Sequence, residues 1–183
     1  LLTAQCSQLL FGIYAPHSGR PEEERVEFWE GLETLINQHR GHGAVHLIGD
    51  LNTQLDGRLP GEDAVIGPRP FGHGPEGIDE DAHSNRSQLI RLCQSLELCF
   101  PQTWSTLSPS QQVTHRPPGT PLHHRPFAPD AYRQLDHFVT EQRRRTWLTR
   151  IHSQPLVALN SNHFLVEAQL KVVLGAPTPT TRT

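Results

Sequence analysis

The stretch "SNHFLVEAQL", residues 161–170, carries the pattern that decides the fold. From Phe164 onward apolar and polar side chains alternate, and this period of two predicts a half-buried β-strand. The core face would carry Phe164, Val166, Ala168, Leu170 and Val172, and the solvent face Glu167, Gln169 and Lys171. The polar triplet Ser161, Asn162 and His163 precedes this strand without a glycine or proline, so an ordinary turn does not explain it.

Strand, helix and strand alternate in the first part of the chain. "SQLLFGIYAP" (7–16) is typical of a strand, and Pro16 ends it. Pro21 and the acidic residues after it suit a helix start. The helix would carry an apolar stripe of Val26, Trp29, Leu32 and Ile36 and stop at "HRGHG" (39–43). "AVHLIG" (44–49) then has the apolar run of a buried strand, so the order predicts a layered domain of helices and sheets.

A long loop and a second helix follow. Residues 57–83 are rich in Gly, Pro and Asp, and a loop of this length is usually functional or disordered. Ser84 is a suitable cap for a helix, whose buried face would be Leu89, Ile90, Cys93 and Leu96. A short strand is expected near residues 98–100.

The last third alternates Pro- and His-rich segments with strands. Residues 105–131 lead to an expected strand over "YRQLDHFVT" (132–140). "PLVALN" (155–160) then precedes the strand quoted first. Domain organisation is expected to be one domain over residues 1–172, followed by a disordered, low-complexity tail over 173–183.

Bulk composition limits the classes of function. The chain has 183 residues and a formal net charge of −3, which excludes binding to nucleic acid through overall positive charge. Its three cysteines, Cys6, Cys93 and Cys99, have no metal-site spacing and favour a reducing, intracellular compartment. No segment resembles a membrane span. The chain contains no methionine and opens in strand-like sequence, so we expect it to be part of a longer protein.

Three polar clusters lie at the ends of expected strands: "GDLN" (49–52), "QLDHF" (134–138) and "SNHF" (161–164). Strand ends that meet at one edge of a layered sheet commonly build sites. Together the clusters supply carboxylates, amides and an imidazole, which suit phosphodiester hydrolysis by a positioned water, a base and hydrogen-bond donors. Each cluster alone is as easily a turn, a solvated pair or a structural histidine.

The ordered set of motifs resembles the endonuclease/exonuclease/phosphatase family, and within it the endonuclease domains of non-LTR retrotransposons. The resemblance covers most of residues 9–170. The motifs that carry it, in the order of the family, are "FGIYAPHSGR", "HLIGDLNTQLD", "NRSQLIRLCQSLELCFPQTW", "QQVTH", "YRQLDHFVT" and "NSNHFLVEAQL". The resemblance implies an α+β fold, a four-layer α/β sandwich of two packed, mostly antiparallel sheets flanked by helices, here lacking its first strands.

The resemblance also implies roles for five residues as catalytic groups. Asp50 would position or deprotonate the attacking water, and Asn52 would donate a hydrogen bond to the scissile phosphate. Asp136 would orient His163, which would stabilise the charged phosphoryl transition state. Tyr14 would contact the phosphate or the leaving oxygen, so Tyr14 and Asn52 are the expected substrate-binding residues.

The resemblance implies Mg²⁺ or Mn²⁺ as cofactor and DNA as substrate. The sequence departs from the family pattern at two of the expected metal-binding positions. The family's metal-binding glutamate precedes the strand that ends at Tyr14, where only thirteen residues remain. Asn162 stands where the family usually has aspartate, so it is expected to be a weak metal ligand. Further implications are a reverse transcriptase downstream in the same polyprotein, no membrane partner, and an intracellular, nuclear location.

Several alternatives stay open. The domain could be a catalytically inactive remnant, or a phosphatase acting on a small phosphorylated ligand. His39, His42 and His46 have a spacing that suggests zinc, although no fourth ligand is evident. The arginines at 143–145 could bind a phosphate backbone near the active edge or form a solvated turn. We expect the chain itself to hydrolyse phosphodiesters poorly or not at all, because its metal site is incomplete.

Overall fold

Two β-sheets form the frame of the molecule in the computed structural model, which describes residues 7–79, 81–121, 125–157 and 160–171. The larger sheet has the strand order β1-β2-β4-β3, and the smaller one pairs β5 with β6. β1 runs parallel to β2, and the other pairings are antiparallel. The strands are β1 (Gln8–Tyr14), β2 (Ala44–Asp50), β3 (Leu98–Cys99), β4 (Asp136–Glu141), β5 (Leu148–Gln154) and β6 (Leu165–Leu170).

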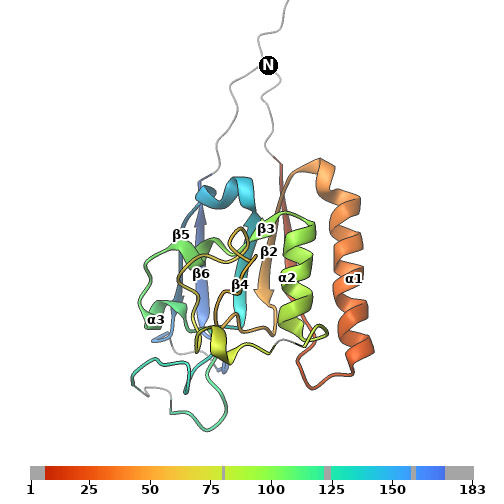
Figure 1. The fold of residues 1–183 in the computed structure, drawn as a ribbon. Helices are drawn as coiled ribbons and strands as arrows, with labels where there is room; N and C mark the ends of the chain where they lie inside the picture. The colour runs from red at the N-terminus through yellow and green to blue at the C-terminus, as the bar shows by residue number, and fades with distance from the viewer. Residues whose placement is uncertain (1–6, 80, 122–124, 158–159, 172–183) are drawn as a thin grey trace, which may run out of the picture.

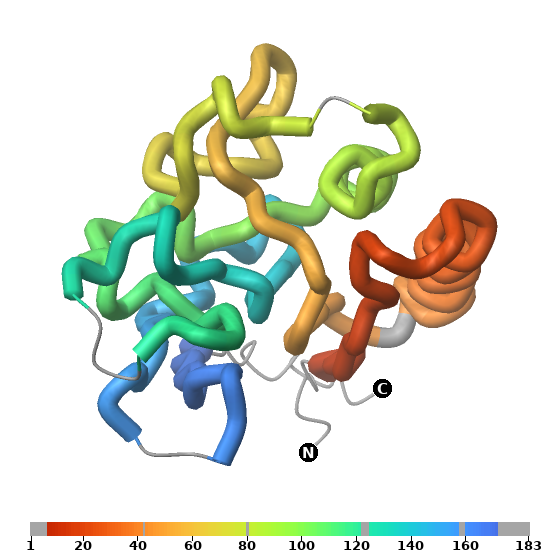
Figure 2. Tube along the Cα trace, turned by 90° about the horizontal axis from the view of Figure 1, so that it is seen from below, coloured from red at the N-terminus to blue at the C-terminus, as the bar shows by residue number. Residues whose placement is uncertain are grey.

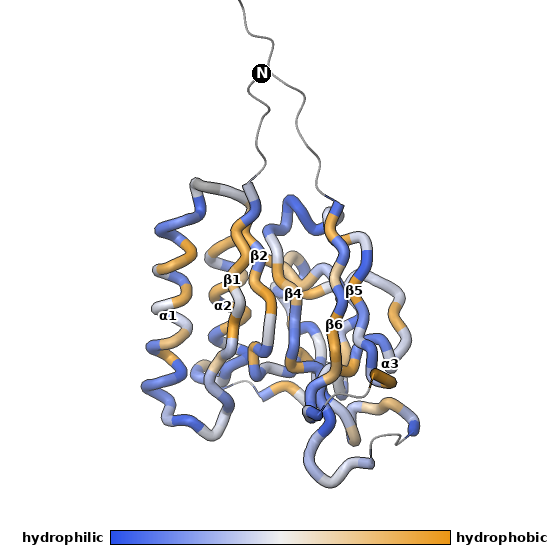
Figure 3. The backbone as a smooth tube through the Cα atoms, turned by 180° about the vertical axis from the view of Figure 1, so that it is seen from behind, coloured by the Kyte–Doolittle hydropathy of each residue, from blue (hydrophilic) through white to orange (hydrophobic). Residues whose placement is uncertain are grey.

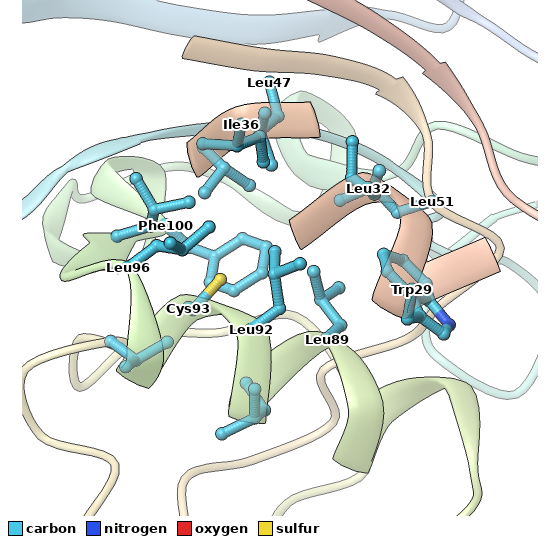
Figure 4. Close-up of a cluster of buried hydrophobic side chains, with 14 of the residues drawn as sticks. Trp29, Leu32, Ile36, Leu47, Leu51, Leu89, Leu92, Cys93, Leu96 and Phe100 are labelled. Carbon is cyan, nitrogen blue, oxygen red and sulfur yellow. The ribbon is translucent and has the colours of Figure 1, made fainter. Parts of the chain in front are cut away.

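Two helices cover one face of the larger sheet (Figure 1). α1 (Glu22–His39) begins after Pro21, and the Oγ of Ser84 caps α2 (Asn85–Ser95) by accepting the N–H of Ser87. Their apolar faces pack on each other and on β2, as the cluster of leucines, Trp29 and Phe100 in Figure 4 shows. The predicted α+β arrangement of two sheets flanked by helices is therefore confirmed. No helix in the described part of the chain is long and apolar enough to span a membrane.

Short helices complete the chain. They are η1 (Arg40–His42), η2 (Pro75–Gly77), η3 (Pro101–Trp104), α3 (Pro109–Gln112) and η4 (Gln142–Trp147). The sequence had indicated no helix at α3, which begins at Pro109 after Ser108 has formed a capping box.

The smaller sheet differs from the sequence-based expectation in two ways. β5 was not predicted, because "LTRIHSQ" (148–154) offers Ile151 as its only large apolar residue on one face. β6 has the predicted alternation but not the predicted burial, since Val166 and Leu170 are half-buried and Leu165 is 47% exposed. The expected core strand is thus paired on one side only among the described residues.

An open apolar groove of about 530 Å³ separates the inner faces of the two sheets. β1, β2 and β4 contribute Leu10, Ile48 and Phe138 to it, and β5 and β6 contribute five more residues. Figure 3 shows hydrophobic segments along β2 and β6, on the two sides of this groove. Leu10 is 57% exposed there, which is unusual for a leucine on the inner face of a sheet.

The loop over residues 57–83 is ordered where the structure describes it, because α2 holds it. The guanidinium of Arg86 donates to both carboxylate oxygens of Glu62 (2.9 and 2.6 Å) and to the carbonyls of Leu55 and Gly57. Arg86 and Glu62 are both buried. The loops after β2, before β4 and before β6 lie at one edge of the molecule, seen end-on in Figure 2.

The strand predicted over 132–140 is shorter than expected and β4 starts only at Asp136. η4, with the arginines at 143–145, follows its other end, opposite the loop edge (Figure 1). Arg143 and Arg144 pair with Glu141, and Arg145 lies over the ring of Trp104. One of the two sequence-based alternatives placed these arginines near the active edge of the sheet, and that placement is wrong. The expected tail over 173–183 and residues 158 and 159 of "PLVALN" lie outside the described residues.

Candidate active site

Strand register places three of the expected residues in one row. Tyr14 pairs with Asp50 between β1 and β2, and Asp50 pairs with Asp136 between β2 and β4. Residues that are paired across neighbouring strands point to the same face of a sheet. This row is the last set of paired residues on the inner face before the loops begin. The two carboxylates therefore lie close to each other at the loop edge.

His163 lies between these carboxylates. Its Nδ1 is 2.9 Å from Oδ2 of Asp136, and its Nε2 is 3.8 Å from Oδ2 of Asp50. Because an ionised carboxylate only accepts hydrogen bonds, Nδ1 carries the proton of the bond to Asp136. This bond anchors the ring at Nδ1, and in the structure Nε2 faces Asp50.

Asp50 is the more buried of the two carboxylates, with a side chain that is 10% exposed. Burial raises its pKa above the ordinary value, and the charge of Asp136 adds to that rise. The N–H of Asn52, bonded to Oδ1 of Asp50 at 2.9 Å, and the nearby His163 act in the opposite direction. A carboxylate with a raised pKa is a stronger base toward water than an ordinary aspartate.

Asn52 adopts a positive φ of 45°, which asparagine tolerates better than most residues. This turn directs its side chain to the end of β1, where Nδ2 donates to the carbonyl of Ala15 at 2.7 Å. Nδ2 has two hydrogens, so one remains for a ligand. The structure therefore brings together Asp50, Asn52, Asp136 and His163.

Tyr14 and Asn162 do not join this group. Tyr14 is 78% exposed, and its side chain lines a separate cavity of about 400 Å³ with His17 and Arg20. Asn162 is exposed, and its Oδ1 lies 3.5 Å from the guanidinium of Arg116. Neither side chain contacts His163 in the structure.

Sequence reasoning missed a short extended segment that braces the site. Thr114 is buried, and its Oγ1 accepts the N–H groups of Leu135 (2.9 Å) and Asp136 (3.0 Å). The carbonyl of Thr114 accepts the N–H of Phe164 at 2.7 Å. One residue thus ties together the backbone that carries Asp136 and the backbone that carries His163. The motif "QQVTH" was visible as part of the resemblance, but nothing in it indicated this role.

The residues present do not fit a divalent metal site. Mg²⁺ and Mn²⁺ take oxygen ligands from several groups at once. Among the described residues no group of three or more His, Cys, Asp and Glu side chains is arranged to hold a metal. Asp50 and Asp136 face His163, and the amide of Asn162 is turned to Arg116.

The zinc-like histidines are not gathered either, as far as they are described. His46 is fully buried in β2, where Nε2 lies 2.6 Å from Oε1 of Gln8 and Nδ1 lies 2.9 Å from Oγ1 of Thr140. The Nδ1 of His39 bonds to the carbonyl of Leu35 in its own helix. The side chain of His42 lies outside the described part of the chain.

Comparison with known proteins gives matches in structure alone. No family model and no curated protein sequence matches this chain. A 3′ phosphatase from Neisseria, solved with a product DNA hairpin, matches with a TM-score of 0.61 and 14% identity over 89% of this chain and 61% of its own. The AP endonuclease LMAP from Leishmania major gives 0.62 and 16% over 91% of this chain and 50% of its own.

The APE2 catalytic domain from Xenopus laevis gives a TM-score of 0.58 and 16% identity, covering 93% of this chain and 52% of its own. The chain thus spans between half and about three-fifths of the length of these structures. At such identities the likeness concerns the fold. Over most of its length the chain has the fold that these phosphatase and AP endonuclease structures share.

Proposed function

We propose that the chain is the C-terminal part of a phosphodiesterase domain that acts on DNA as an endonuclease. One observation carries the proposal: His163 is held between two carboxylates at the loop edge of the sheet, 2.9 Å from Asp136 and 3.8 Å from Asp50. The 3′ phosphatase that shares the fold was solved with DNA bound, which supports DNA as the polymer.

The chemistry follows from the positions of the side chains. Asp50 accepts a proton from water, and the water oxygen forms a bond to phosphorus while the bond from phosphorus to the leaving oxygen breaks. With a proton on each ring nitrogen, His163, oriented by Asp136, donates from Nε2 to a phosphoryl oxygen and offsets the charge that develops there. The remaining N–H of Asn52 donates to the same phosphate. The leaving oxygen takes a proton from solvent, so the products are one phosphate-ended and one hydroxyl-ended strand.

Mg²⁺ or Mn²⁺ is the proposed cofactor of the complete domain, where it would neutralise phosphate charge. The described residues do not form its site, so no step above passes through it. The order of the sequence motifs supports an origin in a non-LTR retrotransposon. With that origin we propose a reverse transcriptase in the same polyprotein and a nuclear location.

A specific observation favours a second candidate, a catalytically inactive remnant that keeps the fold and a DNA contact. Asn162 replaces a carboxylate with a neutral amide, and the structure engages that amide with Arg116. The two candidates agree on the binding of phosphate at His163 and differ in hydrolysis.

A binding experiment tests what the two candidates share. A short DNA duplex should perturb the imidazole resonances of His163 in NMR spectra of the labelled chain, and added salt should weaken the effect. Asp130 is an exposed carboxylate outside the site, so Asp130→Ala serves as a matched control and should bind like the wild type. Binding that leaves His163 unperturbed would contradict the proposal.

A plasmid-nicking assay with Mg²⁺ or Mn²⁺ separates the candidates. We expect little or no nicking by this chain, because the described residues form no metal site. Nicking that disappears in Asp50→Ala but persists in Asp130→Ala would overturn this expectation and establish hydrolysis at Asp50.

A further inference from the structure

His115 is a second imidazole at the candidate active site to which sequence analysis assigned no role. Its ring centroid lies 4.8 Å from that of His163, with the planes tilted by 58°. His115 follows Thr114, the residue that braces the site, and it pairs through its backbone with both Arg133 and His163. No other aromatic ring contact of His163 is found among the described residues.

The backbone around His115 holds that ring in place. His115 donates its N–H to the carbonyl of Arg133 at 3.0 Å and accepts the N–H of Arg133 at 2.9 Å. On the other side, the N–H of Arg116 bonds to the carbonyl of Asn162 at 2.8 Å. The ring therefore belongs to a segment that is hydrogen-bonded both to the backbone that leads to Asp136 and to the backbone that leads to His163.

His163 needs such a neighbour because its own hydrogen bond restrains it at one atom. A ring held only through Nδ1 can still tilt and swing its Nε2 away from Asp50. The terminal torsion of histidine is broad, so hydrogen bonding alone selects the ring plane weakly. A second ring packed against it, with its centroid 4.8 Å away, restricts this freedom.

His115 is suited to be a neutral neighbour of His163. Burial lowers its pKa, and the charges of His163, Arg133 and Arg116 lower it further, while Asp136 acts in the opposite direction. Its Nδ1 is buried and has no hydrogen-bond partner. A neutral imidazole packs on His163 without competing with it for the charge of Asp136.

We propose that His115 is a positioning residue, which keeps the imidazole of His163 oriented toward Asp50 by ring-to-ring packing. The active role of His163 rests on the proposed function, but the packing does not. Contact by the flat ring is the essential property, so another planar ring of similar size should replace His115, and a branched aliphatic side chain should not.

Imidazole NMR of the free, ¹⁵N-labelled protein tests this without DNA or hydrolysis. In the wild type the proton on Nδ1 of His163 should give a distinct resonance that exchanges slowly with water. We expect His115→Ala to lose this resonance through faster exchange, and His115→Phe to retain it. His83 is an exposed histidine paired with Glu22, so His83→Ala is the matched control and should leave His163 unchanged.

The backbone amide spectrum shows whether each variant is folded. If His115→Ala does not fold, His115→Leu takes its place, because leucine fills the volume without a planar ring. Loss of the His163 resonance in Leu and its retention in Phe support the proposal. Retention in a folded Ala or Leu variant overturns it, and so does loss in a folded Phe variant. Failure of the DNA-binding test would remove the proposed function and leave this result standing.

Discussion

Asp50 is a residue at which function and stability are expected to oppose each other. Its carboxylate is nearly buried and lies close to Asp136, so the folded protein holds the proton of Asp50 more tightly than the unfolded chain does. Stability is therefore lost as the pH rises from the ordinary pKa of the unfolded chain through the raised pKa of the folded state, and the cost is constant above it. This cost is absent below the ordinary value of 3.8, where both states are protonated.

Replacement of Asp50 by asparagine is expected to stabilise the protein at pH 7 and to remove any hydrolysis. The amide keeps an acceptor for the N–H of Asn52 but carries no charge. Urea unfolding of the wild type and Asp50→Asn at several pH values measures the effect. The gain in unfolding free energy should shrink as the pH falls toward 3.8. A gain that is constant with pH, or a loss at pH 7, would show that ionisation is not the cause.

The proximity of four site residues could be anticipated from the sequence, because each belongs to a polar cluster at the end of an expected strand. They are Asp50, Asn52, Asp136 and His163. The roles of Thr114 and His115 could not be anticipated in this way. Thr114 acts through its Oγ1, which accepts the N–H groups of Leu135 and Asp136, and the proposed role of His115 depends on its ring contact with His163. Both are tertiary contacts, which no local pattern reports.

Among the elements, α2 has a task beyond packing, because Arg86 on it anchors the loop over 57–83. The buried pair of Arg86 and Glu62 has side chains that are 7% and 8% exposed. Glu62 also accepts the N–H of Leu59 at 2.8 Å, so the same carboxylate binds both Arg86 and the backbone of its own loop. The composition of this segment, rich in Gly and Pro, predicted a long loop correctly but held no sign of the anchor.

Removal of Glu62 should be strongly destabilising. Glu62→Ala leaves a buried guanidinium without its counter-charge, which typically costs about 3–5 kcal/mol. The neighbouring pair of Asp63 and Arg58 is exposed, with side chains that are 69% and 35% accessible, so Asp63→Ala should cost at most about 1 kcal/mol. Chemical denaturation of the two variants measures both values. Equal costs would mean that the loop does not depend on the buried pair.

The strands illustrate where sequence patterns succeed and fail. β6 was predicted because its alternation is visible in the residue types themselves. Its burial was not predictable, since that depends on what covers the inner face. β5 escaped prediction because its buried positions include His152 and Ser153, whose polar side chains hide the pattern.

At the scale of the whole molecule, the apolar groove between the sheets is the main departure from a closed sandwich. An open apolar surface of this kind binds hydrophobic dyes in the native state. We expect the folded chain to enhance the fluorescence of anilinonaphthalene sulfonate, and Val166→Lys to reduce it, because Val166 lines the groove.

Gln169 lies on the same strand but not in the lining of the groove, so Gln169→Lys is the matched control. Near-UV circular dichroism should stay native in all three proteins, which separates groove binding from a molten state. Equal dye binding by Val166→Lys and the wild type would place the dye elsewhere.

The pairing of β2 with β4 also has a kinetic consequence. His46 and Thr140, which meet across these strands, are 94 residues apart in the chain. Domains dominated by such distant contacts have a high contact order and fold slowly, since loop closure must precede the gain from pairing. Asp50 and Asp136 meet through the same pairing, so the candidate site cannot exist in any partly folded form that lacks it. During folding, the candidate site would be assembled only once this long-range pairing of the two central strands has formed.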